Sequence, residues 1–374
     1  CAGDTARDRY ANTDAVHAYS RSLTLQSDWS GADVRAVALE LGVLAYRLGR
    51  HDDAKPHLLR VTDDADSDVD QMNKALRFLS RIAGAQGDFT GQLARCQAMA
   101  ALRDRVTLSE RLAGGAAEAY ALSRQQGYAE ARELVDAHVA VVNPTQASAS
   151  ALASLADLYL VLCITSRYMG DLEASEAAAR RGLEISDQVS AQIVRAAILN
   201  SLSKCLRDKG QAREAAAIAA SAAALFREIG VAGHEFTALL NQGWFLIESA
   251  QFLEAHAVFV RVKERFADDL GWIHRTYLQT GEALASHGLG RHAQAEALAQ
   301  EVLTETEAHG PGEPRAWALY SAGRVLKRRD LLEQAVTTWD ELRRQGWVTR
   351  SLEALTEVAG IEARAALEAR LAKG

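Results

Sequence analysis

The sequence has few prolines, few aromatic side chains and no closely spaced cysteines. Only 4 of its 374 residues are proline and 6% are aromatic, while 48% are hydrophobic. Scarce proline leaves helices uninterrupted, and Ala, Leu, Glu and Arg, which are abundant here, are strong helix formers. Large all-β folds are therefore excluded. Length alone suggests two or three domains of about 150 residues.

A strong charge of either sign is also absent. The chain has 42 basic and 49 acidic residues and a formal net charge of −7. This balance, with so many hydrophobic residues, excludes a disordered chain and a generally basic nucleic-acid binder. We expect no direct contact with nucleic acid.

The four cysteines, Cys1, Cys96, Cys163 and Cys205, include no Cys-x-x-Cys pair, which argues against a zinc finger or a dithiol redox site. Cys163 and Cys205 lie in apolar helical runs, so we expect buried, reduced thiols and a cytoplasmic protein. The long apolar stretch 152–166 contains Asp157 and is shorter than the roughly 20 residues of a membrane helix. No membrane segment is predicted.

One phrase recurs through the chain: a small residue, usually Gly, and a few residues later an Ala at the start of an apolar-periodic run. The intervals between successive key residues are 39, 38, 39, 43, 41, 40, 40 and 40. This regularity predicts nine units of one repeat. The key residues are Ala15, Ala54, Gln92, Ala131, Ala174, Ala215, Ala255, Ala295 and Ala335.

Each unit has the plan of an antiparallel helix pair. A glycine in mid-helix, as at Gly42, Gly243 and Gly323, costs about 1 kcal/mol against Ala, so its recurrence indicates close helix approach. A second glycine is expected to end the first helix in the left-handed conformation. These turn glycines are Gly49, Gly87, Gly127, Gly170, Gly210 and Gly290.

This plan resembles the tetratricopeptide repeat, which pairs a small residue in its first helix with Ala and a bulky residue in its second. The bulky residues here are Tyr19, Leu58, Phe259 and Trp339. The period of about 40 exceeds the family's 34. HEAT repeats share that period, but their proline kinks do not suit a chain with so few prolines. The resemblance implies an all-α, right-handed superhelical solenoid over residues 1–345, its first unit partial, with a C-terminal capping helix in 346–374.

The first 23 residues are similar to the junction behind the ATPase of STAND-type signalling proteins, some fused to nucleotide cyclases and some to LuxR-type regulators. The phrase AGD-x-A-x-x-x-YAN-x-x-A-x-x-x-Y-x-x-AL is matched at Ala2, Gly3, Asp4, Ala6, Tyr10, Ala11, Asn12, Ala15, Tyr19 and Leu23. This resemblance implies the regulatory region of a larger signalling ATPase or transcription regulator, with neighbouring domains of the same chain as partners.

The first residue, Cys1, allows a second interpretation. A fragment of a longer chain is the expectation, because the residues after Cys1 read as a folded helix rather than as a flexible spacer. The alternatives are a tetratricopeptide lipoprotein with an acylated Cys1, or the regulatory appendage of an ATPase or nucleotide cyclase whose catalytic domains lie upstream.

Motifs for catalysis or cofactors are missing. There is no Walker A sequence, no G-x-S-x-G and no HExxH, and Gly288–Ala293 fits G-x-G-x-x-A only after a helix. The pairs His51 with His57 and His287 with His292 lack the spacing of a zinc site. We predict a non-catalytic chain without metal or cofactor.

Aligning the units on their key residues predicts which side chains line the concave groove. The set is mostly basic and partly aromatic, and it favours an acidic or C-terminal carboxylate peptide. Charge reversal at Arg77, Arg81 and Lys204 should then weaken binding with little loss of stability. Alternatively, cations near the ends of first helices only complement the helix dipole, and the aromatics are core. The candidates are Lys74, Arg77, Arg81, Asn200, Lys204, Arg207, Trp244, Tyr277, Tyr320, Arg324 and Lys327.

Overall fold

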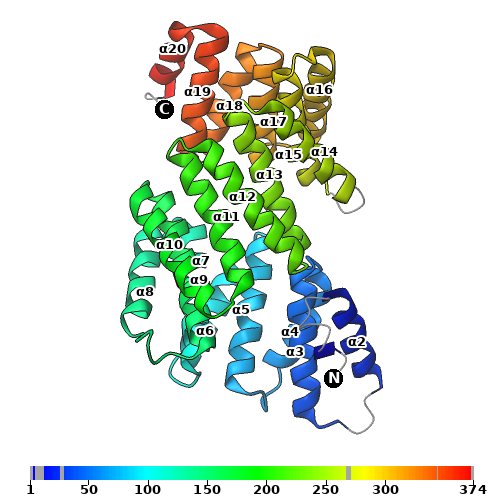
Figure 1. Ribbon diagram of the computed structural model, residues 1–374, viewed down its shortest axis with the longest axis vertical. Helices are drawn as coiled ribbons and strands as arrows, with labels where there is room; N and C mark the ends of the chain where they lie inside the picture. The colour runs from blue at the N-terminus through cyan, green and yellow to red at the C-terminus, as the bar shows by residue number, and fades with distance from the viewer. Residues whose placement is uncertain (1–2, 5–11, 26–28, 267–270, 343, 372–374) are drawn as a thin grey trace. The chain divides into compact units, whose positions relative to one another are not determined.

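The computed structural model describes residues 3–4, 12–25, 29–266, 271–342 and 344–371. All regular secondary structure in these ranges is α-helical, as predicted (Figure 1). The chain divides into two compact units, residues 1–238 and 239–374, and the division falls within α13 (Ala232–Glu248).

The first unit is a series of helix pairs in which each helix packs against the next. α2 is the second helix of a partial first repeat, and five full pairs follow it. The helices are α2 (Asn12–Thr24), α3 (Gly31–Arg47), α4 (His51–Thr62), α5 (Val69–Ala85), α6 (Phe89–Leu102), α7 (Leu108–Arg124), α8 (Tyr128–Ala140), α9 (Ala149–Tyr168), α10 (Leu172–Gln188), α11 (Gln192–Asp208) and α12 (Ala212–Glu228).

The second unit continues the same plan. Two helices, α19 (Gln345–Ala359) and α20 (Ile361–Leu371), lie in the C-terminal segment, and they are separated by Gly360 in the left-handed conformation (φ +86°). The helices after α13 are α14 (Phe252–Phe266), α15 (Trp272–Gly288), α16 (His292–His309), α17 (Glu313–Val325), α18 (Arg329–Glu341), α19 (Gln345–Ala359) and α20 (Ile361–Leu371).

The key residues of the repeat lie at the start of every second helix, and eight of the nine are buried. The exception is Ala174, which is only half-buried, whereas its neighbour Ser175 is fully buried. The key position of that repeat is therefore Ser175, and the intervals on either side are 44 and 40 residues. Ser175 Oγ donates to the carbonyl of Cys163 in the preceding helix at 2.8 Å. A hydroxyl is tolerated at this buried position because it has a hydrogen-bond partner.

Side-chain caps explain where several helices begin. Ser30 and Asp33 form a capping box at the start of α3, and Thr107 and Ser148 accept backbone amides at the starts of α7 and α9. These oxygens satisfy amides that have no partner within the helix. The local sequence thus sets the first turn of these helices.

The turn between the two helices of a pair places one residue in the left-handed region. Glycine occupies this position at Gly49, Gly87, Gly170, Gly210 and Gly290, as predicted. The prediction for Gly127 is wrong, because its φ is −77° and the left-handed residue is its neighbour Gln126. Ala250 and Lys327 occupy the same position in later repeats. Lys327 therefore lies in a turn and not on a first helix.

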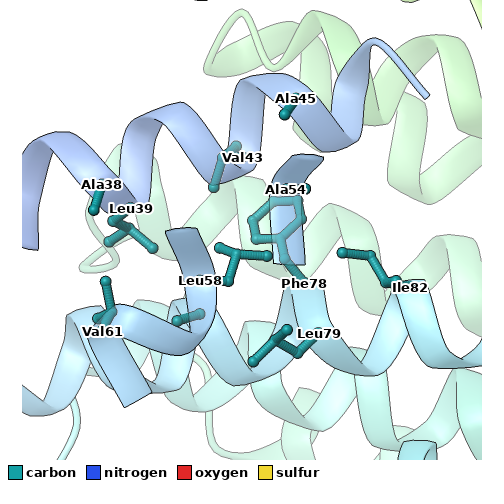
Figure 2. Packing of buried hydrophobic residues seen from close by; sticks show 11 residues of the cluster. Ala38, Leu39, Val43, Ala45, Ala54, Leu58, Val61, Phe78, Leu79 and Ile82 are labelled. Atoms are coloured by element: carbon teal, nitrogen blue, oxygen red, sulfur yellow. The ribbon is translucent and has the colours of Figure 1, made fainter. Parts of the chain in front are cut away.

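Three consecutive helices, α3, α4 and α5, form one hydrophobic core cluster of the first unit. Ala38, Leu39, Val43 and Ala45 of α3 meet Ala54, Leu58 and Val61 of α4 and Ala75, Phe78, Leu79 and Ile82 of α5 (Figure 2). Each pair thus buries its apolar faces against the first helix of the next pair, which is how a repeat array gains stability from its neighbours.

The mid-helix glycines allow this packing. A Cβ at Gly42 would lie 2.7 Å from Leu58 Cγ, and a Cβ at Gly243 would lie 2.5 Å from the ring of Phe259. Leu58 and Phe259 are both fully buried. The predicted close approach of the two helices is confirmed, and the bulky residue of the second helix fills the space that the glycine leaves.

Candidate functional site

The first helices of successive pairs in the first unit bring polar side chains together on one face. Tyr46 (α3), Arg81 (α5), Tyr120 (α7) and Asp157 (α9) act on one another electrostatically, and Arg81 also acts on His234 (α13). A cation in α5 can neighbour α9 and α13 only if this layer of helices is curved with these residues on its inside. We call this surface the inner face. Its members are Tyr46, Arg81, Tyr120, Asp157, Lys204 and His234.

Arg81 is at the centre of the inner face. Its Nη2 donates to Asp157 Oδ2 at 3.1 Å, and its guanidinium carbon lies 5.7 Å from the centre of the Phe78 ring. The side chain is 32% exposed, so solvent and ligands can reach it. Burial lowers the pKa of Arg81, but Asp157, with Tyr46 and Tyr120, outweighs this and raises it. The guanidinium is held in place by a carboxylate and an aromatic ring.

His234 lies at the start of α13, where its ring contacts Phe226 with 5.1 Å between ring centres. The residue is exposed to solvent on one side. Burial by the protein around it, together with Arg81 and Lys204, lowers the pKa of His234 to about 4. The imidazole is therefore neutral at pH 7 and can accept or donate a hydrogen bond.

The two predicted cations earlier in α5 are both paired with carboxylates. Lys74 Nζ is 2.7 Å from Glu40 Oε1 in α3, and Arg77 Nη2 is 3.3 Å from Glu110 Oε1 in α7. These two cations are therefore neutralised by ion pairs. Charge reversal at Arg77 or Arg81 would place two carboxylates together, so we expect it to destabilise the first unit.

A hollow of about 590 Å³ opens beside these pairs, at the amino ends of α3, α5, α7 and α9. Lys74, Glu40 and Glu110 line it together with the hydroxyls of Ser109, Ser148 and Ser150. Ala36, Leu39 and Leu108 also line it, so its surface is part apolar and part charged. Of the predicted groove residues, Lys74 alone lines it.

The remaining predicted residues of the first unit lie in α11. Lys204 and Asn200 are half-buried, and Lys204 is close enough to lower the pKa of His234. Arg207 Nε is 2.9 Å from Asp208 Oδ1, and Asp208 Oδ2 also accepts from Arg167 Nη1 at 3.0 Å. Arg167 thus links the end of α9 to Asp208 at the end of α11, and Arg207 pairs with the same carboxylate, which favours the structural interpretation of Arg207.

The predicted aromatics of the second unit belong to its core. Trp244 and Tyr320 are 8% and 7% exposed. Trp317 joins them, with ring centres 4.3 Å from Trp244 and 4.0 Å from Trp347. Tyr277 is half-buried and meets the edge of Trp317 at 6.3 Å. Burial raises the pKa of Tyr277. The aromatic-core alternative holds here.

The two predicted cations of the second unit have different surroundings. Arg324 donates to Tyr320 Oη at 3.2 Å and lies 3.7 Å from Glu357 in α19. Lys327 is exposed in the turn after α17 with a φ of +52°.

Sequence reasoning found Arg81 and Lys204 but missed Tyr46, Tyr120, Asp157 and His234. The missed carboxylate follows Arg81 by 76 residues, close to two repeat lengths. A search for opposite charges one or two periods apart at the inner positions would have found it. Glu110 follows Arg77 by only 33 residues, which is less than one period, so such a search would not have found it.

Within the described ranges, no group of three or more His, Cys, Asp or Glu is placed to hold a metal ion. Cys96, Cys163 and Cys205 are buried free thiols, as expected for the last two, whereas Cys1 lies outside the described residues.

One described helix, α9, is long and apolar enough to cross a membrane by length and composition. Half of that span is buried inside the protein, and its Asp157 pairs with Arg81. Both features are those of a core helix in an array.

Comparison with known proteins gives matches only among solved structures. No family model matches the chain, and no curated protein matches it. A Rap protein complexed with competence and sporulation factor is similar over 98% of this chain and 97% of its own, with 11% identity and a TM-score of 0.57. The apo form of RapI covers 98% and 96%, with 10% identity and a TM-score of 0.49.

A tetratricopeptide repeat protein from Parabacteroides merdae ATCC 43184 is similar over 77% of this chain and 98% of its own, with 16% identity and a TM-score of 0.45. At these identities the likeness concerns the fold alone. In fold, the chain is similar to the Rap protein over nearly its whole length.

Proposed function

We propose that this chain is a non-catalytic binding array that holds a segment of a partner protein or a peptide on the inner face of its first unit. One observation carries the proposal. Six first helices, α3 to α13, bring two tyrosines, two cations, a carboxylate and a neutral histidine to one curved surface. Tyrosine and arginine are enriched among the residues that dominate binding energy in protein interfaces.

The chemistry of the inner face suits an extended segment with an acidic group. Arg81 is held by a single carboxylate, and Lys204 and His234 lie near it. A carboxylate of the partner can share or replace Asp157 on the guanidinium, and the charge-assisted hydrogen bonds would be retained. Tyr120, which is 36% exposed, offers a ring and a hydroxyl beside that position.

The fold is compatible with this role, since the Rap protein of similar fold was solved with competence and sporulation factor bound. We further propose that the array is the cytoplasmic regulatory region of a larger signalling ATPase or transcription regulator, as the phrase near residues 2–23 implies. In such a protein, binding would shift a neighbouring domain between two states. The upstream reading frame tests this second part, which fails if it encodes neither kind of domain.

The binding proposal is tested with short synthetic peptides that differ only in net charge and in a free or amidated C-terminus. Fluorescence anisotropy gives the Kd of each. We expect acidic peptides to bind most tightly, and Lys204→Gln to weaken them about tenfold, as for a charge-assisted contact. Lys55→Gln, at an exposed position on the second helix α4, is the matched control. Equal effects of the two substitutions, or no binding by any peptide, would contradict the proposal.

A further inference from the structure

The two ends of the first unit are joined by one side chain. Asn12, at the start of α2, donates from Nδ2 to the carbonyls of Ile229 and Gly230 at 3.0 and 3.1 Å. These residues are 217 and 218 positions further along the chain. Asn12 is 4% exposed and Ile229 is 1% exposed, so the contact is buried. The N-terminal phrase includes Asn12, and no local role explains it.

The carbonyls that Asn12 meets are at the end of a helix. Ile229 and Gly230 form the turn between α12 and α13, and Gly230 has a φ of +70°. The last carbonyls of a helix find no amide donor within the helix, so they need a donor from outside it. The amide of Asn12 is that donor, and it therefore acts as a cap supplied from the opposite end of the unit.

At its own end, α2 is fixed to the array. Ala15 and Tyr19 of α2 are buried against Leu41 and Leu44 of α3. Tyr19 also donates from its hydroxyl to Asp4 Oδ1 at 2.6 Å. A movement of the α12–α13 turn relative to α3 must therefore break the Asn12 contact.

The same turn supports part of the inner face. Phe226, in the last turn of α12, packs against His234 in the first turn of α13. His234 in turn lies near Arg81 and Lys204. A displacement of Ile229 and Gly230 would thus move His234 away from the other members of the inner face.

We propose that the Asn12 contact is an intramolecular clasp that closes the first unit around its inner face, and that release of this clasp admits and frees the bound segment. Two neutral hydrogen bonds from one side chain are weak enough to break and re-form during binding. The clasp therefore sets the rate at which the inner face is reached. Through the clasp, α2 would transmit movements of other parts of the chain to the inner face.

The test measures access to the inner face and needs no partner. In a Cys1→Ser background, Tyr120→Cys places one reactive thiol on the inner face, because burial raises the pKa of the thiols of Cys96, Cys163 and Cys205. Two reagents are compared on the full chain: N-ethylmaleimide and a maleimide that carries a long polyethylene glycol chain. The small reagent reports the reactivity of the thiol, and the bulky one reports the opening of the unit.

Asn12→Asp is nearly isosteric and replaces the donor by an acceptor that faces two carbonyls. We expect it to raise the rate of bulky labelling about tenfold, as for a local opening, and to leave the small reagent's rate unchanged. Asp14→Asn, at an exposed position of α2, is the control and should change neither rate. Hydrogen exchange should quicken in α2 and the α12–α13 turn but not in α9.

An unchanged bulky rate in Asn12→Asp, with the helix content retained, would overturn the clasp. If Asn12→Asp does not fold, Asn12→Ala removes the donor without adding a charge and is judged by the same two rates. Because neither readout uses a peptide, the clasp can fail while peptide binding succeeds, and the reverse is equally visible.

Discussion

Arg81 in α5 pairs with Asp157 in α9, with 3.1 Å between Nη2 and Oδ2 and 76 residues between the two positions. The intervening helix pair, α7 and α8, separates the two residues in the chain. They can meet only because the first unit is curved. The ion pair also fixes the cation that lowers the pKa of His234. The charge state of the inner face therefore depends on a contact that no single repeat contains.

Stability of the first unit should fall as the pH is lowered from about 6.5 to about 4. The pKa of His234 is lowered to about 4 by burial and by Arg81 and Lys204. The unfolded chain, with an ordinary histidine pKa of about 6.5, takes up a proton in this window while the folded chain does not. The contribution of His234 is therefore present above pH 6.5 and lost as pH falls toward 4. Urea unfolding followed by circular dichroism measures it.

His234→Gln should flatten that part of the pH dependence, and Arg81→Gln should raise the pKa of His234 toward its ordinary value. An NMR titration of the histidine ring in wild type and in Arg81→Gln gives the pKa directly. A His234 pKa near 6.5 in the wild-type chain would contradict the placement of Arg81 and Lys204 around it.

Two glycines from successive first helices enclose the same ring in the second unit. A Cβ at Gly243 would lie 2.5 Å from Phe259, and one at Gly281 would lie 2.4 Å from it. Gly243→Ala and Gly281→Ala should each destabilise the second unit by about 1–3 kcal/mol, because the fully buried ring cannot move aside. Tryptophan fluorescence during urea unfolding reports this unit, since five of the six tryptophans lie after residue 238.

Phe259→Leu should reduce the cost of either alanine, and the double-mutant cycle measures the coupling. Gly346→Ala is the control on the exposed side of α19, where the nearest atom to an added Cβ is an Arg350 nitrogen at 3.5 Å. It should be neutral or stabilise by up to about 1 kcal/mol through helix propensity. Equal stabilisation by all three alanine substitutions would mean that helix propensity and not packing decides.

The repeat could be predicted from the sequence because it depends on local patterns. Gly42, Leu58 and Ala54 act within one pair, and their spacing is visible in the chain. The register was missed only where Ser175 replaces Ala, since Ala174 fits the pattern equally well in the sequence. The hydrogen bond to Cys163, which decides between them, involves the preceding helix.

The inner face could be predicted only in part. The register places Arg81 and Lys204 on the first helices, but their neighbours depend on how far each pair turns relative to the last. Asp157 and His234 reach Arg81 because of that accumulated rotation, and Asn12 reaches Ile229 for the same reason. The sequence pattern of one repeat does not determine the rotation between successive pairs. The ion pairs and the clasp can therefore be recognised only in the structure.

With Ser175 rather than Ala174 at the key position, the same substitution should have different costs at these two adjacent residues. Ser175→Leu should destabilise by about 1–3 kcal/mol, because the site is fully buried and the larger side chain overpacks it. Ala174→Leu, at a half-buried position of the same helix, should cost less than about 1 kcal/mol. The difference in urea midpoint between the two variants measures the register, and a larger loss in Ala174→Leu would restore Ala174 as the key residue.

The left-handed turns predict where this chain can be stabilised. Ala250 has a φ of +57° at the position where Gly210 has a φ of +82° in an earlier repeat. An L-residue in that conformation costs about 1 kcal/mol relative to glycine, because its Cβ crowds the following carbonyl. Ala250→Gly should therefore stabilise the second unit by up to about 1 kcal/mol. The greater conformational entropy of glycine in the unfolded chain reduces this gain. Gly210→Ala should destabilise the first unit by a similar amount, although an added Cβ there meets no atom within 4 Å. Urea midpoints that move in the same direction for the two exchanges would show that backbone strain does not control these turns.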